Sequence, residues 1–289
     1  MGLLCRSLIT VVAFFSFAAA AGAQSTSTDE IQRTYPQPAN GQIWIRNIFG
    51  NVRVTAWDQP DVKVVSLKRA DTSANLASAE VVVQNQSDGL CIASWYAGSR
   101  HSFKEWFGLA SDPCRDSQNL HGDRADLATV DYTISLPRNS QVTILNSEGD
   151  VEVQGTAGKL YVDIDKGRLT ARDVSGECTL AGSYKGVNVT LTALPRDTSI
   201  FSYVGPLVVY VAPDLSARIR AHSNRGEVRN DFGWEQRPHQ DLQASMGSGK
   251  VSLEVTSVDG RVEIRRLQPP QPEPATKKKL STATRKKAH

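Results

Sequence analysis

Apolar and polar residues alternate along most of this chain, and turn-forming residues interrupt the alternation at regular intervals. Aliphatic side chains occupy every second position in DVEVQ, KLYVDI, RLTARDV and VNVTLTAL, which is the period of strands with one buried face. Gly149, Gly158, Gly167 and Gly176 follow one another at steps of nine residues, the length of one short strand and its turn. The pattern therefore predicts a succession of short strands.

A longer period appears when every second turn is taken. These turns are 18, 19, 19, 21 and 23 residues apart, and their glycines are Gly149, Gly167, Gly186, Gly205, Gly226 and Gly249. Self-similarity at about 20 residues is typical of solenoids, in which stacked coils bury apolar sides that no single coil can bury. We expect an all-β fold, a single elongated, β-helix-like β-solenoid with coils of about 19 residues, over residues 41–267.

The pairing of Val151 separates this fold from a β-sandwich of nine-residue hairpins, which the shorter spacing also allows. In a solenoid Val151 pairs in parallel with a residue one coil later, near Leu169, whereas in a sandwich it lies beside an antiparallel Val162. The side chains expected to face the core are Val151, Val153, Val162, Ile164, Val187, Val189, Val251, Leu253, Val255, Val262 and Ile264. Three of them, Val151, Val189 and Val262, are expected in one apolar column.

The N-terminal segment differs from the repeats. Arg6 precedes a nearly uncharged apolar run, and small residues follow that run. This pattern predicts a signal peptide over residues 1–23, cleaved after Ala23, and hence an exported protein without an integral membrane segment, located in the periplasm or at the cell surface. A retained membrane anchor is the alternative, although the run is shorter than a spanning helix needs. Residues 24–40 form a polar lead.

The C-terminal segment, residues 268–289, has almost no apolar content and is expected to be a disordered basic tail. The whole chain carries a net charge of +3, and the excess is concentrated in this tail. We expect Lys277, Lys278 and Lys279 either to contact anionic envelope polymers or lipid head groups by charge attraction, or only to keep the chain soluble. An exported protein meets little nucleic acid, so we expect no nucleic-acid partner.

Aromatic residues are concentrated where the repeat is interrupted, in an inserted loop over residues 91–124. The sequence of this loop includes Trp95, Tyr96, Trp106 and Phe107. Ser102 followed by Glu105 is a capping-box pattern, which predicts a short helix with aromatic residues on one face. Two interpretations stay open: a lid that packs its rings onto the solenoid, or a binding loop in which Trp95, Tyr96 and Trp106 stack on sugar or peptide.

Three cysteines remain after removal of the signal peptide. Cys91 and Cys114 flank the aromatic loop, and an exported protein meets an oxidising compartment, so we expect these two to form a disulfide. Cys178 lies among alternating small residues and is expected to be a buried, inert thiol.

The sequence offers no convincing catalytic or metal-binding pattern. Asp163 and Asp165 share an outward face, as do Asp150 and Glu152, but the neighbours expected across the repeat form a mixed, solvated face. No histidine or cysteine pair has metal-ligand spacing, and Gly247–Lys250 is a turn that lacks the rest of a phosphate-binding loop. We therefore expect no catalytic residue, no metal and no cofactor.

Three phrases suggest a family. NIFGNVRVTAWDQPDVKV, NSEGDVEVQGTAGKLYVDIDKGRLTARDVSGE and SGKVSLEV resemble the adhesin-like β-repeat domains of unknown function in exported bacterial proteins. The resemblance covers residues 41–265 and implies a β-solenoid with a binding or structural role at the cell envelope, whose partner would be a polysaccharide, an anionic polymer or another envelope protein. A polysaccharide-acting β-helix enzyme, a lyase or a glycoside hydrolase, is the alternative function.

Overall fold

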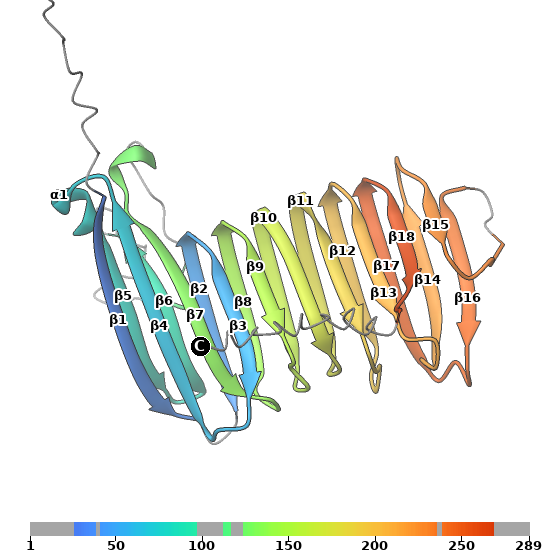
Figure 1. Ribbon diagram of the computed structural model, residues 1–289, viewed down its shortest axis with the longest axis horizontal. Helices are drawn as coiled ribbons and strands as arrows, with labels where there is room; N and C mark the ends of the chain where they lie inside the picture. Colours follow the sequence, from blue (N-terminus) through green and yellow to red (C-terminus); the bar gives the residue numbers. More distant parts are fainter. Residues whose placement is uncertain (1–25, 39–40, 97–111, 117–123, 236–238, 269–289) are drawn as a thin grey trace, which may run out of the picture.

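The computed structural model describes residues 26–38, 41–96, 112–116, 124–235 and 239–268 of the 289-residue chain. This part of the chain is nearly all β, as predicted (Figure 1). Its two short helical segments are α1 (Ser73–Leu76), which Thr72 caps at its N-terminus, and a 3-10 turn at Arg124–Asp126. Among the described residues, no helix is both long enough and apolar enough to cross a membrane.

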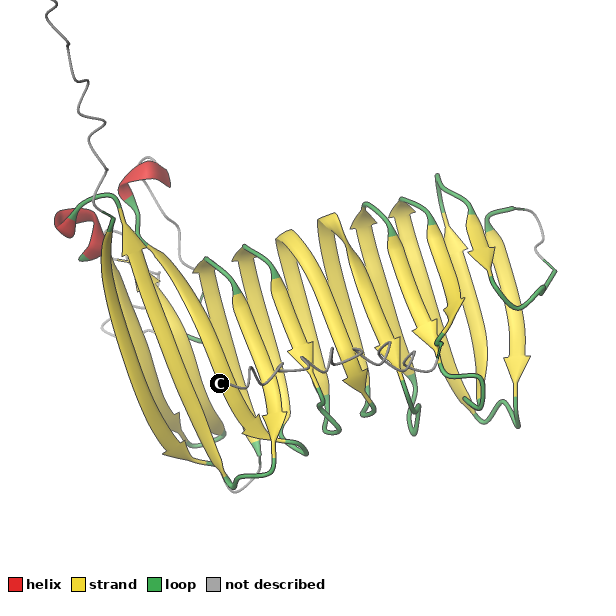
Figure 2. Cartoon of the chain, in the orientation of Figure 1, coloured by secondary structure: helices red, strands yellow, loops and turns green. Residues whose placement is uncertain are grey.

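The strands form two hydrogen-bonded ladders along the long axis of the molecule (Figures 1 and 2). The first ladder contains, in spatial order, β5 (Ala79–Gln86), β6 (Gly89–Tyr96), β2 (Gln42–Phe49), β8 (Gln141–Glu148), the first parts of β10 (Leu160–Val174) and β11 (Cys178–Leu191), β12 (Thr198–Val204), β17 (Val251–Asp259), β14 (Ala217–Ser223) and β16 (Asp241–Met246).

The second ladder contains β1 (Ser27–Pro36), β4 (Asp61–Ala70), β7 (Thr129–Pro137), β3 (Val52–Trp57), β9 (Val151–Gln154), the second parts of β10 and β11, β13 (Leu207–Val211), β18 (Val262–Arg266) and β15 (Val228–Asn230). Because β10 and β11 run through both ladders, all strands belong to one sheet.

Parallel pairing at the predicted spacing dominates the middle of both ladders. Val151 pairs in parallel with Leu169, and Leu169 pairs in parallel with Val187. The same row continues through Leu207 to Val262. The antiparallel Val151–Val162 pairing that a hairpin sandwich requires is therefore not the one observed.

The order of strands in space corrects the expectation that coils follow one another in sequence. β2 and β3 lie between β6–β7 and β8–β9, and β17 and β18 lie between β12–β13 and β14–β15. The stack ends in antiparallel pairs, β1–β4 and β5–β6 at one end and β14–β16 at the other. The strands share the same apolar alternation, so the pattern alone does not specify which strands are neighbours.

Aliphatic side chains of both ladders meet in one core. All eleven side chains that the alternation places inward are buried, except Val251, which is partly buried. Val151 and Val262 lie in the same row of the second ladder, whereas Val189 lies in the next row, beside Val209. The predicted apolar column is therefore two adjacent rows.

Glycines stack at the corner between the ladders. A Cβ atom added to Gly149 would lie 2.0 Å from the carbonyl oxygen of Gly50, and one added to Gly167 would lie 2.0 Å from that of Gly149. A Cβ added to Gly260 would likewise lie 2.0 Å from the carbonyl oxygen of Gly205, and one added to Gly226 would lie 2.1 Å from that of Gly260. The repeat therefore requires glycine because neighbouring strands of the stack touch through their backbones at this corner.

One glycine in the predicted series is not at this corner. Gly249 follows β16 in a turn with φ +60°, and Gly260 occupies the corner position in the last coil. A loop that holds Phe232 and Trp234 separates β15 from β16; the two rings stack at 4.4 Å and pack against the core.

Buried amides support the same corner. Asn47 Nδ2 donates to the carbonyl oxygens of Gly50 and Val130, both at 3.0 Å, and Asn146 Nδ2 donates to Gly149 O at 2.8 Å. Each asparagine lies three residues before its glycine, so its side chain holds the carbonyl at the turn.

One strand, β1, was not predicted from the sequence. It lies within the polar lead of residues 24–40 and pairs along its whole length with β4 in antiparallel register, from Ser27 opposite Ala70 to Pro36 opposite Asp61. Its side chains are exposed or only partly buried because it forms the edge of the second ladder. An edge strand of this kind lacks the aliphatic alternation from which the other strands were predicted.

Candidate functional site

An aromatic groove crosses the outer face of the first ladder. We use this name for the hollow of about 470 Å³ whose lining residues are Gln42, Trp44, Gln141, Val142, Thr143, Leu145, Lys159 and Tyr161. These residues come from β2, β8, β10 and the residue before β10. The groove is an open depression on the outer face of the sheet.

The strand register places the two rings of the groove. Trp44 pairs with Thr143 on β8, and Thr143 pairs with Tyr161 on β10. All three are outward positions, since their neighbours along each strand are buried. Trp44 and Tyr161 therefore stand two strands apart, with backbone positions about 9.6 Å from each other along the ladder and Thr143 between them.

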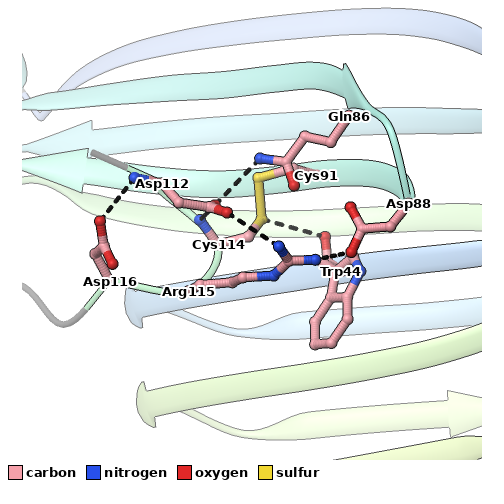
Figure 3. The surroundings of a disulfide bond; sticks show 8 residues. All are labelled: Trp44, Gln86, Asp88, Cys91, Asp112, Cys114, Arg115 and Asp116. Carbon is pink, nitrogen blue, oxygen red and sulfur yellow. Dashed lines mark hydrogen bonds and ion pairs between the residues drawn. A yellow bond between two sulfur atoms is a disulfide. The ribbon is translucent and has the colours of Figure 1, made fainter. Parts of the chain in front are cut away.

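The predicted disulfide is present and lies beside Trp44 (Figure 3). Cys91 and Cys114 are bonded, with Cα atoms 5.9 Å apart, and Cys91 is the register partner of Trp44 on β6. The guanidinium carbon of Arg115 lies 5.2 Å from the centre of the Trp44 ring, a cation–π geometry. Trp44 is thus partly buried, with Arg115 over its ring and the disulfide packed against it, and it also contributes to the lining of the groove.

Ion pairs hold Arg115 in this position. It pairs with Asp88 in the turn between β5 and β6, and its Nη1 lies 3.7 Å from Asp112. Asp112 also accepts hydrogen bonds from Gln86 Nε2 at 3.1 Å and from the backbone amide of Cys114 at 3.0 Å. The segment 112–116 is therefore tied to the turn before β6 as well as through the disulfide (Figure 3).

The groove carries little net charge. Lys159 Nζ lies 3.0 Å from Glu177, so its charge is compensated by a neighbouring coil. Tyr161 is exposed over 36% of its surface, which leaves its ring available for contact.

Two of the binding residues that the sequence suggested, Trp95 and Tyr96, lie among the described residues. Trp95 lies on β6, partly buried, with Glu80 as its register partner. Tyr96 is fully buried; its hydroxyl donates to Ala128 O at 3.0 Å and its ring meets Phe49 edge-on at 5.5 Å. Burial raises the pKa of the Tyr96 phenol, so this side chain belongs to the core and not to a surface.

The other candidates that the sequence suggested lie outside the described residues: the loop residues Trp106 and Phe107, the tail residues Lys277, Lys278 and Lys279, and the signal peptide. Their predicted roles stay predictions. Trp44 and Tyr161 were not chosen from the sequence, although both stand at outward positions of alternating strands.

A second hollow, of about 580 Å³, lies on the outer face of the second ladder. Glu152 in its lining receives a hydrogen bond from Arg53 Nε at 3.1 Å and pairs with Arg172. Burial alone would raise the pKa of Glu152, but the hydrogen bonds and charges of the two arginines outweigh it, and its pKa lies below the ordinary value. Asp131 in the same hollow pairs with Arg69. Glu152 is therefore held as an anion by the two arginines and is not poised to donate a proton.

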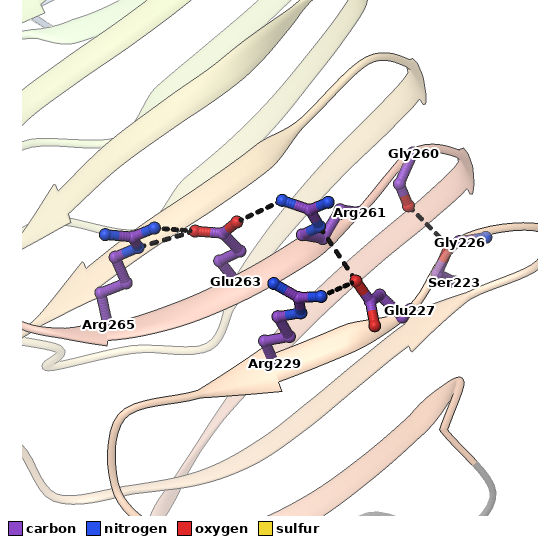
Figure 4. A network of polar contacts seen from close by, with 8 residues as sticks. All are labelled: Ser223, Gly226, Glu227, Arg229, Gly260, Arg261, Glu263 and Arg265. Carbon is purple, nitrogen blue, oxygen red and sulfur yellow. Dashed lines mark hydrogen bonds and ion pairs between the residues drawn. The ribbon is translucent and has the colours of Figure 1, made fainter.

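The C-terminal coils carry a similar chain of alternating charges (Figure 4). Arg261 bridges Glu227 at 3.2 Å and Glu263 at 3.3 Å, while Arg229 pairs with Glu227 and Arg265 with Glu263. This is the mixed polar face that the sequence predicted.

The other predicted carboxylate pair has a different environment. Asp163 lies between Leu145 and Ala181 in the outer face of the first ladder. Burial, followed by the charge of Asp165, raises its pKa above the usual value. Asp163 therefore lies beside the aromatic groove, and its environment favours the protonated form of its carboxyl group.

Cys178 is free and buried, as predicted. Burial, with a smaller contribution from Glu177, raises the pKa of its thiol to about 12, which keeps it protonated and unreactive at neutral pH. Among the described residues, no group of three or more histidine, cysteine or acidic side chains is placed to hold a metal ion.

Comparisons with known proteins give distant structural likenesses. No protein-family model and no curated protein matches the chain. A putative cell adhesion protein from Clostridium sporogenes ATCC 15579 is similar at 14% identity and a TM-score of 0.46, over 83% of this chain and 100% of its own. A putative adhesin from Bacteroides fragilis NCTC 9343 is similar at 12% identity and a TM-score of 0.30, over 83% of this chain and 97% of its own.

Proposed function

We propose that this chain is an exported, non-enzymatic β-solenoid that serves as an adhesin-like binding or scaffolding module of the bacterial cell envelope. The observation that carries the proposal is the aromatic groove on the outer face of the first ladder, with Trp44 and Tyr161 standing in register two strands apart. The two-ladder core holds that face rigid, so contacts made there cost little conformational entropy.

Export is supported by the Cys91–Cys114 disulfide, because such bonds persist in oxidising compartments. The predicted signal peptide agrees with it: cleavage after Ala23 would leave a chain whose first described strand begins at Ser27. The protein would then act in the periplasm or at the cell surface.

A binding role is favoured over catalysis by the ion pairs of the second hollow. General acid–base chemistry needs a carboxyl group that keeps its proton beside one that does not, whereas Glu152 and Asp131 are both paired with arginine. The alternative, a polysaccharide-acting enzyme, has one observation in its favour: Asp163, with its raised pKa, lies near the aromatic groove.

One experiment separates the two functions. The mature protein, from Gln24, is mixed with isolated bacterial envelopes, the suspension is centrifuged, and both the pelleted protein and the soluble sugar released over time are measured. We expect the protein in the pellet and no released sugar. Release of sugar that is abolished by Asp163→Asn would establish the enzyme instead, and protein that stays in the supernatant would contradict the binding role.

A further inference from the structure

We infer that the aromatic groove binds a neutral, β-linked pyranose polysaccharide whose sugar rings stack on Trp44 and Tyr161. The inference rests on the proposed function and adds to it a ligand class and a site.

The spacing of the two rings suits such a chain. Trp44 and Tyr161 are separated by one intervening strand, β8, and therefore by about 9.6 Å along the stack. This separation is close to the length of a disaccharide unit in an extended β-linked chain. Sugar rings in such a chain present apolar C–H faces at that repeat, so a glycan lying along the stack, across the strands, would meet an aromatic ring with every second sugar.

The outer face continues this arrangement. Phe201 on β12 is another outward ring, two strands beyond β10. It is displaced by one row along the strand, because its register partner on β11 is Ala181, whereas that of Tyr161 is Thr179. A longer oligosaccharide bound at Trp44 and Tyr161 would reach Phe201, and a disaccharide would not. The groove therefore predicts affinity that rises with chain length.

The charge of the lining favours an uncharged ligand. Among the described residues that line the groove, Lys159 is the one with a full charge at neutral pH, and Glu177 neutralises it at 3.0 Å. Polyanions and acidic peptides would find no unpaired cation in this lining. The lining also contains the hydroxyl of Thr143, a group that can donate to or accept from the hydroxyl groups of an uncharged sugar.

Trp44 is also held in place before any ligand arrives. Arg115 covers the ring at 5.2 Å, the disulfide lies on the adjoining strand, and Cys114 Sγ lies 3.7 Å from Trp44 O. A side chain that is already fixed loses little rotamer freedom on binding. The disulfide therefore has a role beyond stability, since it helps to position one wall of the site.

The test is isothermal titration calorimetry of the mature protein with three oligosaccharides: cellohexaose, chitohexaose and hexagalacturonate. The first two are neutral and differ in their acetamido groups, and the third is a polyanion. We expect binding of at least one neutral hexasaccharide, weaker binding of the matching disaccharide, and no tighter binding of hexagalacturonate. Tyr161→Ala should weaken the neutral ligand by about tenfold or more, as for other aromatic anchors.

The matched control is Tyr203→Ala, since Tyr203 is 53% exposed on β12 of the same ladder and does not line the groove. Trp44→Ala should behave as Tyr161→Ala does, and the tyrosine variant keeps the test valid if loss of the tryptophan disturbs folding. Absence of neutral-sugar binding, equal weakening by Tyr203→Ala, or preference for hexagalacturonate would overturn the inference. If the wild-type protein still pellets with envelopes in that event, the binding role stands and the groove is not its site.

Discussion

The glycine corner makes a sharp prediction for Gly167. An ideal Cβ there would lie 2.0 Å from the carbonyl oxygen of Gly149 and 2.7 Å from its carbonyl carbon, whereas real Cβ atoms essentially never approach within 3.0 Å. Gly167 does not have a left-handed φ, so Gly167→Ala tests the close approach alone. The neighbouring coil cannot easily retreat, since Gly149 N donates to Lys166 O at 2.9 Å.

The expected cost follows from the rigidity of the contact. Overpacking a core with side chains typically costs about 1–3 kcal/mol, and here backbone meets backbone, so we expect a loss of about 3 kcal/mol. Alanine also restricts the unfolded chain, which returns only about 0.4–1 kcal/mol. For a chain of this size, a loss of about 3 kcal/mol lowers Tm by about 6–12 °C.

The assay is thermal unfolding followed by circular dichroism, with Gly233→Ala as the matched control. Gly233 has φ +73° and nothing within 4 Å of an added Cβ, so alanine there costs only the left-handed backbone strain, about 1–2 kcal/mol. A Gly167→Ala protein that melts at or above the temperature of Gly233→Ala would refute the stacked-backbone explanation of the repeat.

Three further predictions concern the disulfide and two carboxylates. Replacing Cys91 and Cys114 by alanine should cost about 3 kcal/mol from loop entropy, seen in urea unfolding, and should also weaken glycan binding; unchanged stability would contradict the entropic estimate. The pKa of Asp163 is raised in the folded protein, so its ionisation destabilises the fold as pH rises through that pKa. Asp163→Asn should therefore have a higher Tm than the wild-type protein at about pH 7 and the same Tm at about pH 3. A lower Tm of the variant at neutral pH would contradict this. The pKa of Glu152 is lower in the folded protein than its ordinary value, so ionised Glu152 stabilises the fold above the ordinary pKa and loses this effect as pH falls through the folded-state pKa. Glu152→Gln should therefore lower Tm slightly at neutral pH and leave it unchanged in acid. A Tm difference that persists in acid would rule out the ion pairs as its cause.

The strands and their inward-facing side chains could be predicted from the sequence because apolar residues alternate with polar ones. Leu169 was expected near Val151, and the two are register partners. The corner glycines were also found, but as turns; their closer reason, contact between backbones, depends on the distance between coils. A sequence does not display that distance.

The candidate site could not be predicted because it depends on the order in which the strands pair. Trp44 lies far from Tyr161 along the chain, and the two become neighbours only because β2 lies beside β8. The outward position of each ring was visible in QIWIRN and KLYVDI, but not their alignment. Conversely, Tyr96 was chosen for its place in an aromatic cluster, and the buried hydrogen bond to Ala128 O explains why it is in the core.

The most direct test of the proposed binding role is elution of the native protein from its own envelope fraction. Cells are fractionated, and the pelleted envelopes are washed first with about 1 M salt, where the Debye length is about 3 Å and charge attraction is screened, and then with neutral β-linked hexasaccharide. We predict that the chain is found in the pellet with its N-terminus at Gln24, resists the salt and is released by the sugar. Recovery in the soluble cytoplasmic fraction, or full release by salt alone, would contradict that role.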